Sequence, residues 1–561
     1  MIAPLYFVLI FVTQWFHFVL GTNERSESFH PPLNIPLVLS ANFGELRSNH
    51  FHMGLDFKTE AREGLTLHSI DKGYVSRVNV SPYGYGTVVY INHPGGITSV
   101  YAHCQRLTGK LDKRVKELQM KTQNSEADIY FQPNEVPLER GEVFALSGNS
   151  GASQGPHLHF EIRDTYTEEA LNPLLFGFKI ADTKAPSAYT IKAYALDEYG
   201  YMKEGKTQEW SINNNTLGNG TVTLPSNFCS QKGGLGFAIN AIDKFDGASN
   251  SCGLYGSRVI VNGDTLMAQE LNRVAFEHTR YLNAYTDYQA FRGGRKYHKA
   301  FHTEMNPLTI YQKKSKGILF IKPNTSYNIQ YDAYDQAGNT STTTFTLNIS
   351  DGEINLLPSK LFDPTYLNPN EAWKIDFKDA IIEAPAGCTY EPIPKEVSWN
   401  GTSVIFKSDV WPVQEAFTVR LKPRTDYPIK QQYIGVKNGA NWSALETEYA
   451  NGWLEAKSKR FGEMAVQIDD KAPNIVGRNV KETIYKSKTK RLIWGIGDYQ
   501  TGLVNYGLEV DGKWQVLDYE SKGDYASYEL NDLELGPHEL IVTATDLAGN
   551  KRTETFNIVL K

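Results

Sequence analysis

The stretch GNSGASQGPHLHFEIRD, residues 148–164, places two histidines one residue apart behind a loop of small residues. Its alternation of apolar and polar residues predicts a β-strand, in which side chains two residues apart leave the same face of a sheet. His157 and His159 therefore share one face, whereas Leu158 and Phe160 point to a core on the other. The pattern fits either a polar patch on a strand or half of a metal site.

Two further fragments of this region carry residues of the same kind. In NHFHMGLDF, residues 49–57, His52 and Asp56 are four residues apart, and this even spacing puts both on one face if the chain is extended there. In SVYAHCQRL, residues 99–107, His103 lies on a strand-like run. Each histidine taken alone is more often a surface or hydrogen-bonded residue than a ligand, so only the combination of fragments is specific.

One aspartate and two histidines are sufficient for a catalytic zinc shell, which has three protein ligands and one open position for water. Zinc lowers the pKa of such a water to about 7 and so provides a nucleophile at neutral pH. Further histidines near the open position can accept the proton of the water and stabilise the developing oxyanion. The region therefore contains the parts of a hydrolytic metal site.

The composition indicates a large, mostly β protein. With 561 residues the chain is too long for one hydrophobic core, so we expect three or four domains. Hydrophobic residues make up 41% and charged residues 21%, which is typical of globular proteins, and long helical patterns are scarce. The formal net charge of −6 is small for this length and argues against nucleic acid as a partner.

The first 21 residues carry no charged side chain and end in glycine, which predicts a signal peptide at 1–21, with a retained membrane anchor as the alternative. No other segment of the sequence is long and apolar enough to cross a bilayer. We therefore expect an exported protein, either secreted or in the periplasm or cell envelope of a Gram-negative bacterium. It would keep no stable membrane span once the signal peptide is removed.

Two pairs of similar segments occur further along the chain. DTKAP at 182–186 is similar to DDKAP at 469–473. YDQAGNTSTTTFTLNI, which starts at Tyr334, is similar to TDLAGNKRTETFNIVL, which starts at Thr545. Such internal similarity indicates that one supersecondary module occurs twice.

Turn residues recur in these segments at the short spacing of β-sandwiches. We therefore predict sandwich domains over 182–350 and 469–561, separated by a β-rich domain over 351–468. The AGN sequences predict tight turns with positive φ at Gly338 and Gly549.

The first sandwich segment is longer than the second. Within it, TLMAQELNRVAFEH, residues 265–278, is either a helix or a polar excursion. Cys229 and Cys252 fall in this segment, and they either form a disulfide or remain free buried thiols.

A long insertion follows His103 and precedes RGEVFALSG. Its apolar residues Leu111, Val115 and Leu118 recur at helical spacing with Lys and Glu between them. This pattern predicts a short amphipathic helix over about 111–124 that borders the candidate site or packs on the sheet.

HMGLDF, YAHCQRL and GNSGASQGPHLHFEIR resemble the three signature blocks of the lysostaphin/LytM-type zinc endopeptidases, metallopeptidase family twenty-three. The resemblance covers about 40–178, and we assign the metallopeptidase domain to 30–181. The expected fold is thus mostly β, with an N-terminal β-sheet metallopeptidase domain that carries a short inserted helix, followed by two or three Ig-like β-sandwich domains.

The resemblance implies one Zn²⁺ per chain, with His52, Asp56 and His159 as its ligands. It implies catalytic roles for His103 and His157, and none of the five positions is substituted. It does not exclude a latent form in which an asparagine near the site blocks the metal.

The activity that the resemblance implies is hydrolysis of peptide cross-links in bacterial peptidoglycan. Two alternatives remain: a non-catalytic envelope scaffold or regulator that docks a cell-wall hydrolase on the same domain, and a metalloprotease that acts on proteins. The expected partners are peptidoglycan stem peptides and cross-links, together with an envelope protein bound through the C-terminal β domains.

Overall fold

The computed structural model describes residues 29–561 apart from 213–216, 218–219, 230–231, 313–314, 355–358 and 408–409. The protein is mostly β, as predicted. The predicted signal peptide, 1–21, lies outside the described residues. In the part of the chain that the structure describes, no helix combines the length and the hydrophobicity that crossing a bilayer requires.

The N-terminal part, up to residue 181, is built on one large antiparallel sheet. Its elements are β1 (Leu39–Ala41), β2 (Leu55–Lys58), β3 (Thr66–His68), β4 (Gly73–Val80), β5 (Thr87–His93), β6 (Ile97–Ala102), β7 (Cys104–Leu107), α1 (Gly109–Thr122), β8 (Ala127–Tyr130), β9 (Pro137–Leu138), β10 (Val143–Ser147), β11 (His157–Asp164), β12 (Ala170–Leu171) and η1 (Pro173–Phe176). The main sheet runs β1-β2-β11-β6-β5-β4-β8, and a smaller one runs β3-β10-β7. Leu158 and Phe160 of β11 are fully buried, as the alternation predicts.

Helix α1 confirms the predicted amphipathic helix, although it starts and ends two residues earlier than expected. It buries Leu111 and Val115 and packs on β7 and β8. The helix ends where Gln123 adopts a left-handed conformation with φ 50°.

The first sandwich follows, and its two sheets enclose a separate hydrophobic core. Its elements are β13 (Ser187–Leu196), β14 (Met202–Ser211), β15 (Thr221–Leu224), η2 (Ser226–Phe228), β16 (Gly234–Ile242), β17 (Gly256–Val261), β18 (Asp264–Glu270), β19 (Arg273–Val274), η3 (Phe276–Tyr281), α2 (Leu282–Tyr285), α3 (Tyr288–Arg292), β20 (Tyr297–Lys299), β21 (Thr325–Tyr334) and β22 (Thr340–Ile349). The sheets run β14-β13-β16-β20 and β15-β22-β21-β17-β18.

Residues 265–278, which the sequence left as a helix or a polar excursion, instead form most of β18, then β19 and the start of η3. The reason is the turn before them. Asn262 and Gly263 both have positive φ, 51° and 91°, the conformation of a two-residue hairpin turn, and they pair β17 with β18.

The middle part contains two five-stranded sheets around a third core. Its elements are η4 (Lys360–Phe362), β23 (Tyr366–Leu367), β24 (Trp373–Asp376), β25 (Ala380–Ala384), β26 (Ile393–Pro394), β27 (Val397–Trp399), β28 (Ser403–Phe406), β29 (Pro412–Leu421), η5 (Ile429–Gln431), β30 (Gln432–Asn438), β31 (Asn441–Ala444), β32 (Thr447–Ala450), β33 (Trp453–Arg460) and β34 (Glu463–Ile468). The sheets run β24-β25-β29-β33-β32 and β27-β28-β34-β30-β31.

The C-terminal sandwich repeats the topology of the first. Its strands are β35 (Asn474–Gly477), β36 (Thr483–Ile484), β37 (Arg491–Gly497), β38 (Leu503–Val510), β39 (Lys513–Gln515), β40 (Asp518–Glu520), β41 (Tyr525–Glu529), β42 (Gly536–Asp546) and β43 (Lys551–Leu560). Its five-stranded sheet, β36-β43-β42-β38-β39, has the order of β15-β22-β21-β17-β18, and in both sheets the first pair is parallel. Gly338 and Gly549 have φ of 93° and 83°, as predicted.

The predicted domain boundaries remain a proposal, and the first core does not stop at residue 181. Phe245, Leu271 and Tyr285 pack in the same cluster as the N-terminal sheet. Strand β19 also pairs with β12. The N-terminal part and the first sandwich are therefore joined by shared packing as well as by the chain.

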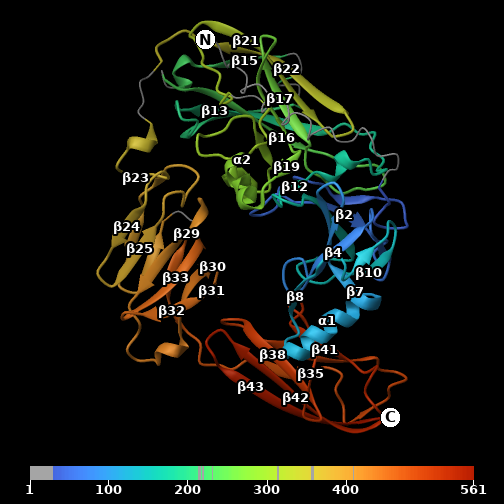
Figure 1. Cartoon of the computed structure of the whole chain (residues 1–561). Coiled ribbons are helices and arrows are strands. Elements are labelled where there is room, and N and C mark those ends of the chain that lie inside the picture. The colour runs from blue at the N-terminus through green and yellow to red at the C-terminus, as the bar shows by residue number, and fades with distance from the viewer. Residues whose placement is uncertain are drawn as a thin grey trace, which may run out of the picture.

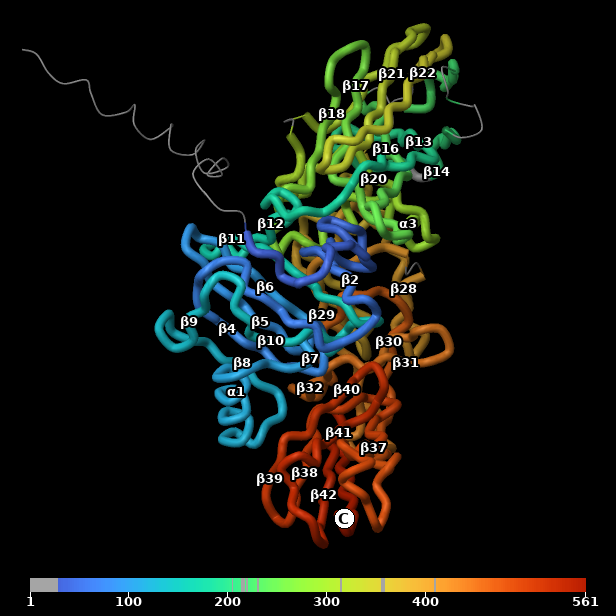
Figure 2. The backbone as a smooth tube through the Cα atoms, turned by 90° about the vertical axis from the view of Figure 1, so that its right-hand side faces the viewer, coloured from blue at the N-terminus to red at the C-terminus, as the bar shows by residue number. Residues whose placement is uncertain are grey.

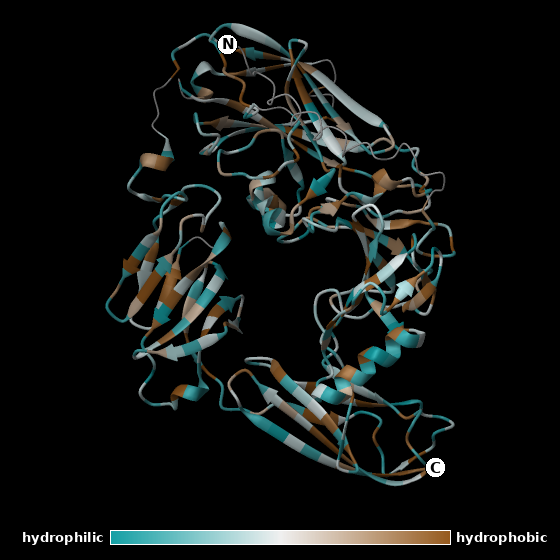
Figure 3. Cartoon of the chain, in the orientation of Figure 1, coloured by the Kyte–Doolittle hydropathy of each residue, from teal (hydrophilic) through white to brown (hydrophobic). Residues whose placement is uncertain are grey.

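The four parts follow one another around a ring in Figure 1, and Figure 2 shows the same neighbours from the side. Arg280 Nη2 donates to the carbonyl of Val413 at 2.8 Å, which joins the first sandwich to the middle part. The backbone N–H of Leu517 donates to Ser125 Oγ at 2.9 Å, which joins the C-terminal sandwich to the N-terminal part near α1. Figure 3 shows hydrophobic and hydrophilic residues alternating along many strands, as sandwiches require.

The four cysteines, Cys104, Cys229, Cys252 and Cys388, are all buried and free. Cys229 and Cys252 therefore do not form a disulfide in this structure. Burial raises the pKa of each of these two thiols to about 12.

Candidate active site

A cleft of about 1060 Å³ opens beside the start of β11. The five residues predicted for the site all line it: His52, Asp56, His103, His157 and His159. Asn250 and Ser251 of the first sandwich line it as well, so two parts of the chain form its walls. A volume of this size is sufficient for a short peptide.

Three donor atoms converge in the cleft. His52 Nε2 and His159 Nδ1 each lie 2.9 Å from Asp56 Oδ1, and the two nitrogens lie 3.0 Å apart. Ligands about 2.0 Å from a tetrahedral zinc ion are separated by roughly 3.3 Å, so one ion fits this set after small adjustments. The donor types, two imidazoles and a carboxylate, are those of a catalytic zinc site.

The pairing of β2 with β11 brings two of these residues together, because His159 lies directly opposite Asp56. His52 reaches the same centre from just before this strand. Strand β2 begins only at Leu55, and residues 52–54 are not assigned to a strand.

Gly54 allows the segment just before β2 to approach β11 closely. A Cβ atom at this position would lie 2.4 Å from the carbonyl oxygen of Phe160, which is closer than real contacts allow. Only glycine fits there, and this close approach lets His52 reach the centre from outside the strand.

The second nitrogen of each of these two histidines is held by the protein. His52 Nδ1 donates to the carbonyl of Asn42 at 2.7 Å, and His159 Nε2 donates to Glu161 Oε1 at 2.8 Å. Such partners fix the tautomer and orientation of a ligand histidine and direct its other nitrogen to the metal. The side chain of Asn42 is hydrogen-bonded to the backbone of Gly253, so it does not block the centre.

Glu161 is fully buried and is the functional residue that the sequence analysis missed. It also accepts hydrogen bonds from Tyr85 Oη at 2.5 Å and Arg163 Nε at 2.6 Å. Burial alone would raise the pKa of Glu161, but the charge of Arg163 and the bond from His159 lower it to about 2. Its position two residues after His159, on the same strand face, was the available signal.

The anions around His159 favour a cation at this ring. Burial lowers the pKa of His159, but its hydrogen bonds to the carboxylates of Asp56 and Glu161 outweigh burial and raise the pKa to about 9. Asp56 is buried too, yet the neighbouring histidines hold its pKa well below the usual range. Arg47 Nη2 donates to the other oxygen, Asp56 Oδ2, at 3.0 Å and orients the carboxylate.

His103 and His157 stand side by side across the cleft, with ring centroids 4.8 Å apart. His103 is not on a strand as predicted. It lies between β6 and β7 with a φ of 59°, a strained conformation of the kind that concentrates at functional sites. Its Nδ1 donates to the carbonyl of Ser150 at 2.8 Å, and His157 Nδ1 donates to the carbonyl of Gly155 at 2.9 Å.

The Nε2 atoms are therefore the nitrogens of this pair that remain available as acceptors. His157 Nε2 lies 3.6 Å from Asp56 Oδ1 and so faces the three converging donors. Burial and the nearby His159 and His157 lower the pKa of His103 to about 3, so this ring is neutral over the ordinary pH range.

Four other histidines of the described N-terminal part, His30, His50, His68 and His93, are not among the predicted site residues. His50 lines the cleft but is exposed. His68 and His93 are buried and not at the surface: His68 Nδ1 donates to the carbonyl of Gly141, and His93 bonds to Ser99 Oγ.

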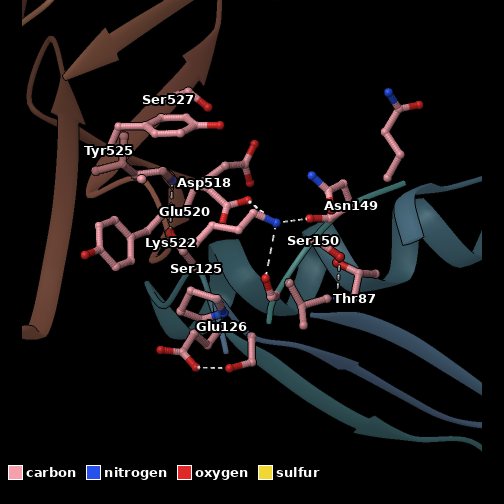
Figure 4. A pocket seen from close by; sticks show the side chains of 18 of the residues that line it. Thr87, Ser125, Glu126, Asn149, Ser150, Asp518, Glu520, Lys522, Tyr525 and Ser527 are labelled. Carbon is pink, nitrogen blue, oxygen red and sulfur yellow. Dashed lines mark hydrogen bonds and ion pairs between the residues drawn. The ribbon is translucent and has the colours of Figure 1, made fainter. Parts of the chain in front are cut away.

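The C-terminal sandwich contacts residues 149–151, the loop whose Ser150 carbonyl is hydrogen-bonded to His103 (Figure 4). The ammonium of Lys522 donates to the carbonyls of Asn149 and Gly151, the latter at 3.2 Å. Ser150, whose carbonyl accepts the bond from His103, lies between these two residues. No sequence pattern indicated this contact, because its two sides are more than 350 residues apart.

Residues 50–120 match the model of peptidase family M23. Over 149 residues the chain is 30% identical to an uncharacterized metalloprotease of Haemophilus influenzae, covering 27% of this chain and 24% of that protein. Over 174 residues it is 28% identical to the DD-carboxypeptidase/endopeptidase Mpg of Neisseria meningitidis, covering 29% of this chain and 34% of that protein. The chain thus spans about a third or less of the length of these curated relatives.

Two solved structures are also similar. The catalytic domain of the M23 protein EnpA from Enterococcus faecalis is 23% identical, with 26% of this chain and 95% of that chain covered and a TM-score of 0.20. The catalytic domain of lysostaphin from Staphylococcus simulans is 20% identical, with 25% and 91% covered and a TM-score of 0.19. By the family match, the chain carries a peptidase family M23 domain, matched over residues 50–120.

Proposed function

We propose that the protein is an exported, zinc-dependent endopeptidase that hydrolyses peptide cross-links of bacterial peptidoglycan. The observation that carries this proposal is the convergence of His52, Asp56 and His159 in a peptide-sized cleft beside a second histidine pair. A family M23 domain that kept the cleft but not the donors would not support it.

In this proposal His52, Asp56 and His159 would hold a zinc ion, which when bound would supply Lewis acidity toward the scissile carbonyl and the attacking water. The protein fixes the ligands beforehand, since Asn42, Glu161 and Arg47 already hold their outer atoms. Little reorganisation is then needed when the metal and the substrate bind.

His103 and His157 are assigned the proton transfers. Each has Nδ1 tied to a backbone carbonyl, so each presents an Nε2 lone pair as a proton acceptor. One of the two takes the proton of the attacking water and returns it to the leaving amine. The pair together stabilises the oxyanion of the tetrahedral intermediate, because a protonated imidazole donates to it.

The proposed substrate rests on relatives that match this part of the chain. One is named a DD-carboxypeptidase/endopeptidase, and lysostaphin is described as an antimicrobial peptidase. The apolar, uncharged residues 1–21 support export to the compartment where peptidoglycan lies. The scaffold alternative is less favoured, because all five predicted residues are present and line one cleft.

The test measures how the zinc-loaded chain lacking residues 1–21 cleaves each of two substrates. One is a synthetic cross-linked stem-peptide dimer, and the other is an unstructured Gly-rich protein. We expect cleavage of the dimer, seen by chromatography and mass. His157→Ala should lower kcat by about 10²–10⁴ while zinc stays bound. His278→Ala, a partly exposed histidine outside the cleft, is the matched control.

Cleavage of the protein substrate alone would instead support a metalloprotease that acts on proteins. Cleavage of neither substrate by protein with one bound zinc would support the scaffold alternative.

A further inference from the structure

We propose that the first sandwich carries a calcium site formed by Asp182, Asp243 and Asp335. One carboxylate oxygen from each residue lies within 4.8 Å of the other two. Oxygen ligands of Ca²⁺ lie 2.3–2.6 Å from the ion, so two of them are at most about 5 Å apart. A single ion can therefore contact all three side chains after small adjustments of their positions. The inference is independent of the peptidase proposal and uses none of its residues.

The fold brings these residues together from three separate segments. Asp182 lies in the linker that enters the sandwich before β13. Asp243 directly follows β16 of one sheet, and Asp335 directly follows β21 of the other. An ion at this point would tie the linker to the ends of both sheets.

Two oxygens of the triad are buried without any hydrogen-bond partner. Asp243 is only 1% exposed, and its Oδ2 has no donor among the described residues. Oδ2 of Asp182 is buried and unpartnered in the same way. A buried carboxylate oxygen that has lost its water without gaining a donor is destabilising, and a cation removes that penalty.

The neighbouring lysine does not fill this role. The ammonium of Lys184 lies 3.3 Å from the carboxylate of Asp246 and donates to the carbonyl of Phe245 at 3.2 Å. No ion pair to Asp182, Asp243 or Asp335 occurs among the described residues, and Lys184 is engaged with Asp246 and Phe245 instead.

The C-terminal sandwich provides an internal comparison, because it contains an equivalent triad of Asp469, Asp498 and Asp546 within the same 4.8 Å. The turns after β21 and β42 are hydrogen-bonded alike. Asp335 binds the backbone and side chain of Asn339 at 2.9 and 2.8 Å, and Asp546 binds Asn550 in the same way at 2.8 and 2.9 Å.

The two triads differ at the two oxygens that are unpartnered in the first. Asp498 Oδ2 accepts the backbone N–H groups of Gln500, Thr501 and Gly502 at 3.0, 2.7 and 2.9 Å. Asp469 Oδ2 accepts the hydroxyl of Thr501 at 2.6 Å. In the C-terminal triad these oxygens are therefore satisfied by the chain itself, whereas in the first triad the described residues leave them without a donor.

The chemistry of the donors selects the ion. All three are carboxylates, and oxygen-only sites with flexible geometry favour Ca²⁺ over zinc, which prefers histidine and cysteine. Waters would complete the six to eight ligands that Ca²⁺ takes.

The proposed site adjoins the cleft. The backbones of Asp243 and Cys252 pair at 3.0 and 2.8 Å, and the loop they enclose carries Asn250 and Ser251 to the cleft wall. An ion on Asp243 would therefore brace one wall of the substrate cleft.

The test is calcium titration of the zinc-loaded full chain, followed by isothermal calorimetry and by the thermal unfolding midpoint. We expect one Ca²⁺ per chain with a Kd of about 10⁻³ M or tighter, and a higher midpoint with calcium. Asp243→Asn and Asp182→Asn should each weaken binding by about tenfold or more, because ligand charge sets affinity. Asp498→Asn is the matched control and should bind calcium as the unsubstituted chain does.

The thermal unfolding midpoint of Asp243→Asn without calcium is a second test. The substitution removes a charge from an unsatisfied cluster, so its calcium-free midpoint should equal or exceed that of the unsubstituted protein. Absence of saturable binding up to about 10 mM calcium would overturn the proposal. So would unchanged binding in Asp182→Asn, which serves if Asp243→Asn does not fold, or loss of binding in Asp498→Asn alone.

Discussion

The histidine-rich centre of the cleft and the aspartate triad of the first sandwich each bring three side chains together. They differ in the hydrogen bonds made by the second polar atom of those side chains. In the cleft, His52, Asp56 and His159 each have their second polar atom held by Asn42, Arg47 or Glu161. In the triad, two oxygens have no partner among the described residues. The first arrangement is the one we propose for a metal with strict geometry, and the second is the one we propose for an ion with flexible geometry.

The largest expected effect separates the two clusters directly. His159→Ala should abolish stoichiometric zinc binding and lower peptidase activity at least about 10³-fold, because it removes a ligand, yet it should leave calcium binding intact. Asp243→Asn should do the reverse. Elemental analysis of the two purified variants measures zinc, and calorimetric titration measures calcium binding; loss of both metals in either variant would break the distinction.

The second prediction concerns the held outer atoms. Glu161→Gln keeps the shape but removes the anion at His159 Nε2, so we expect zinc affinity to fall by about 10–100-fold. Competition with a chromogenic chelator measures the Kd. Glu139→Gln, at an exposed position, should leave it unchanged. Equal affinities in the two variants would mean that the anchor at Glu161 has no influence on the metal.

His298 is a buried histidine outside both clusters and should contribute a pH dependence of stability. Burial lowers the pKa of His298 to about 3 in the folded protein, whereas a histidine in an unfolded chain has a pKa of about 6.5. Its stabilising contribution is therefore complete above pH 6.5 and is lost as the pH falls toward 3. Between pH 6.5 and 5 the loss is about 2 kcal/mol.

His298→Gln should flatten this dependence, whatever it does to the stability at neutral pH. Urea unfolding at several pH values measures how steeply the free energy of unfolding changes with pH in the unsubstituted protein and in His298→Gln. The same slope between pH 6.5 and 5 in both proteins would show that His298 takes up its proton in the folded state.

The smallest expected effect concerns the contact of the C-terminal sandwich with the loop that holds His103. Lys522→Ala removes hydrogen bonds from a charged donor to the carbonyls around Ser150, so kcat should fall roughly fivefold with zinc binding unchanged. The control is Lys551→Ala, an exposed lysine of β43. Equal kcat values in the two variants would mean that the contact does not position His103.

Local patterns predicted much of the fold. The alternation around His157 and His159 gave the strand face correctly, and apolar spacing located α1 to within two residues. The AGN turns identified Gly338 and Gly549 as positions with positive φ. All of these depend on interactions between residues close in the sequence.

Features that depend on distant contacts were not predictable. The close approach of Gly54 to the backbone of Phe160 joins residues far apart in the sequence, and no local pattern marks the positive φ of His103. The aspartate triads form only because strands of two sheets end at one point, and the sequence shows their members 61 and 92 residues apart in the first copy, from Asp182 to Asp243 and from Asp243 to Asp335.

The measurement that tests the proposed zinc endopeptidase most directly is mass spectrometry of the muropeptides released from purified sacculi by the chain lacking residues 1–21. A metal chelator and the His159→Ala variant serve as controls. We predict that cross-linked dimers are converted to monomers only by the zinc-loaded, unsubstituted protein, and the product masses then identify the bond that is cleaved. Persistence of the dimers in the presence of protein with one bound zinc per chain would contradict the proposal.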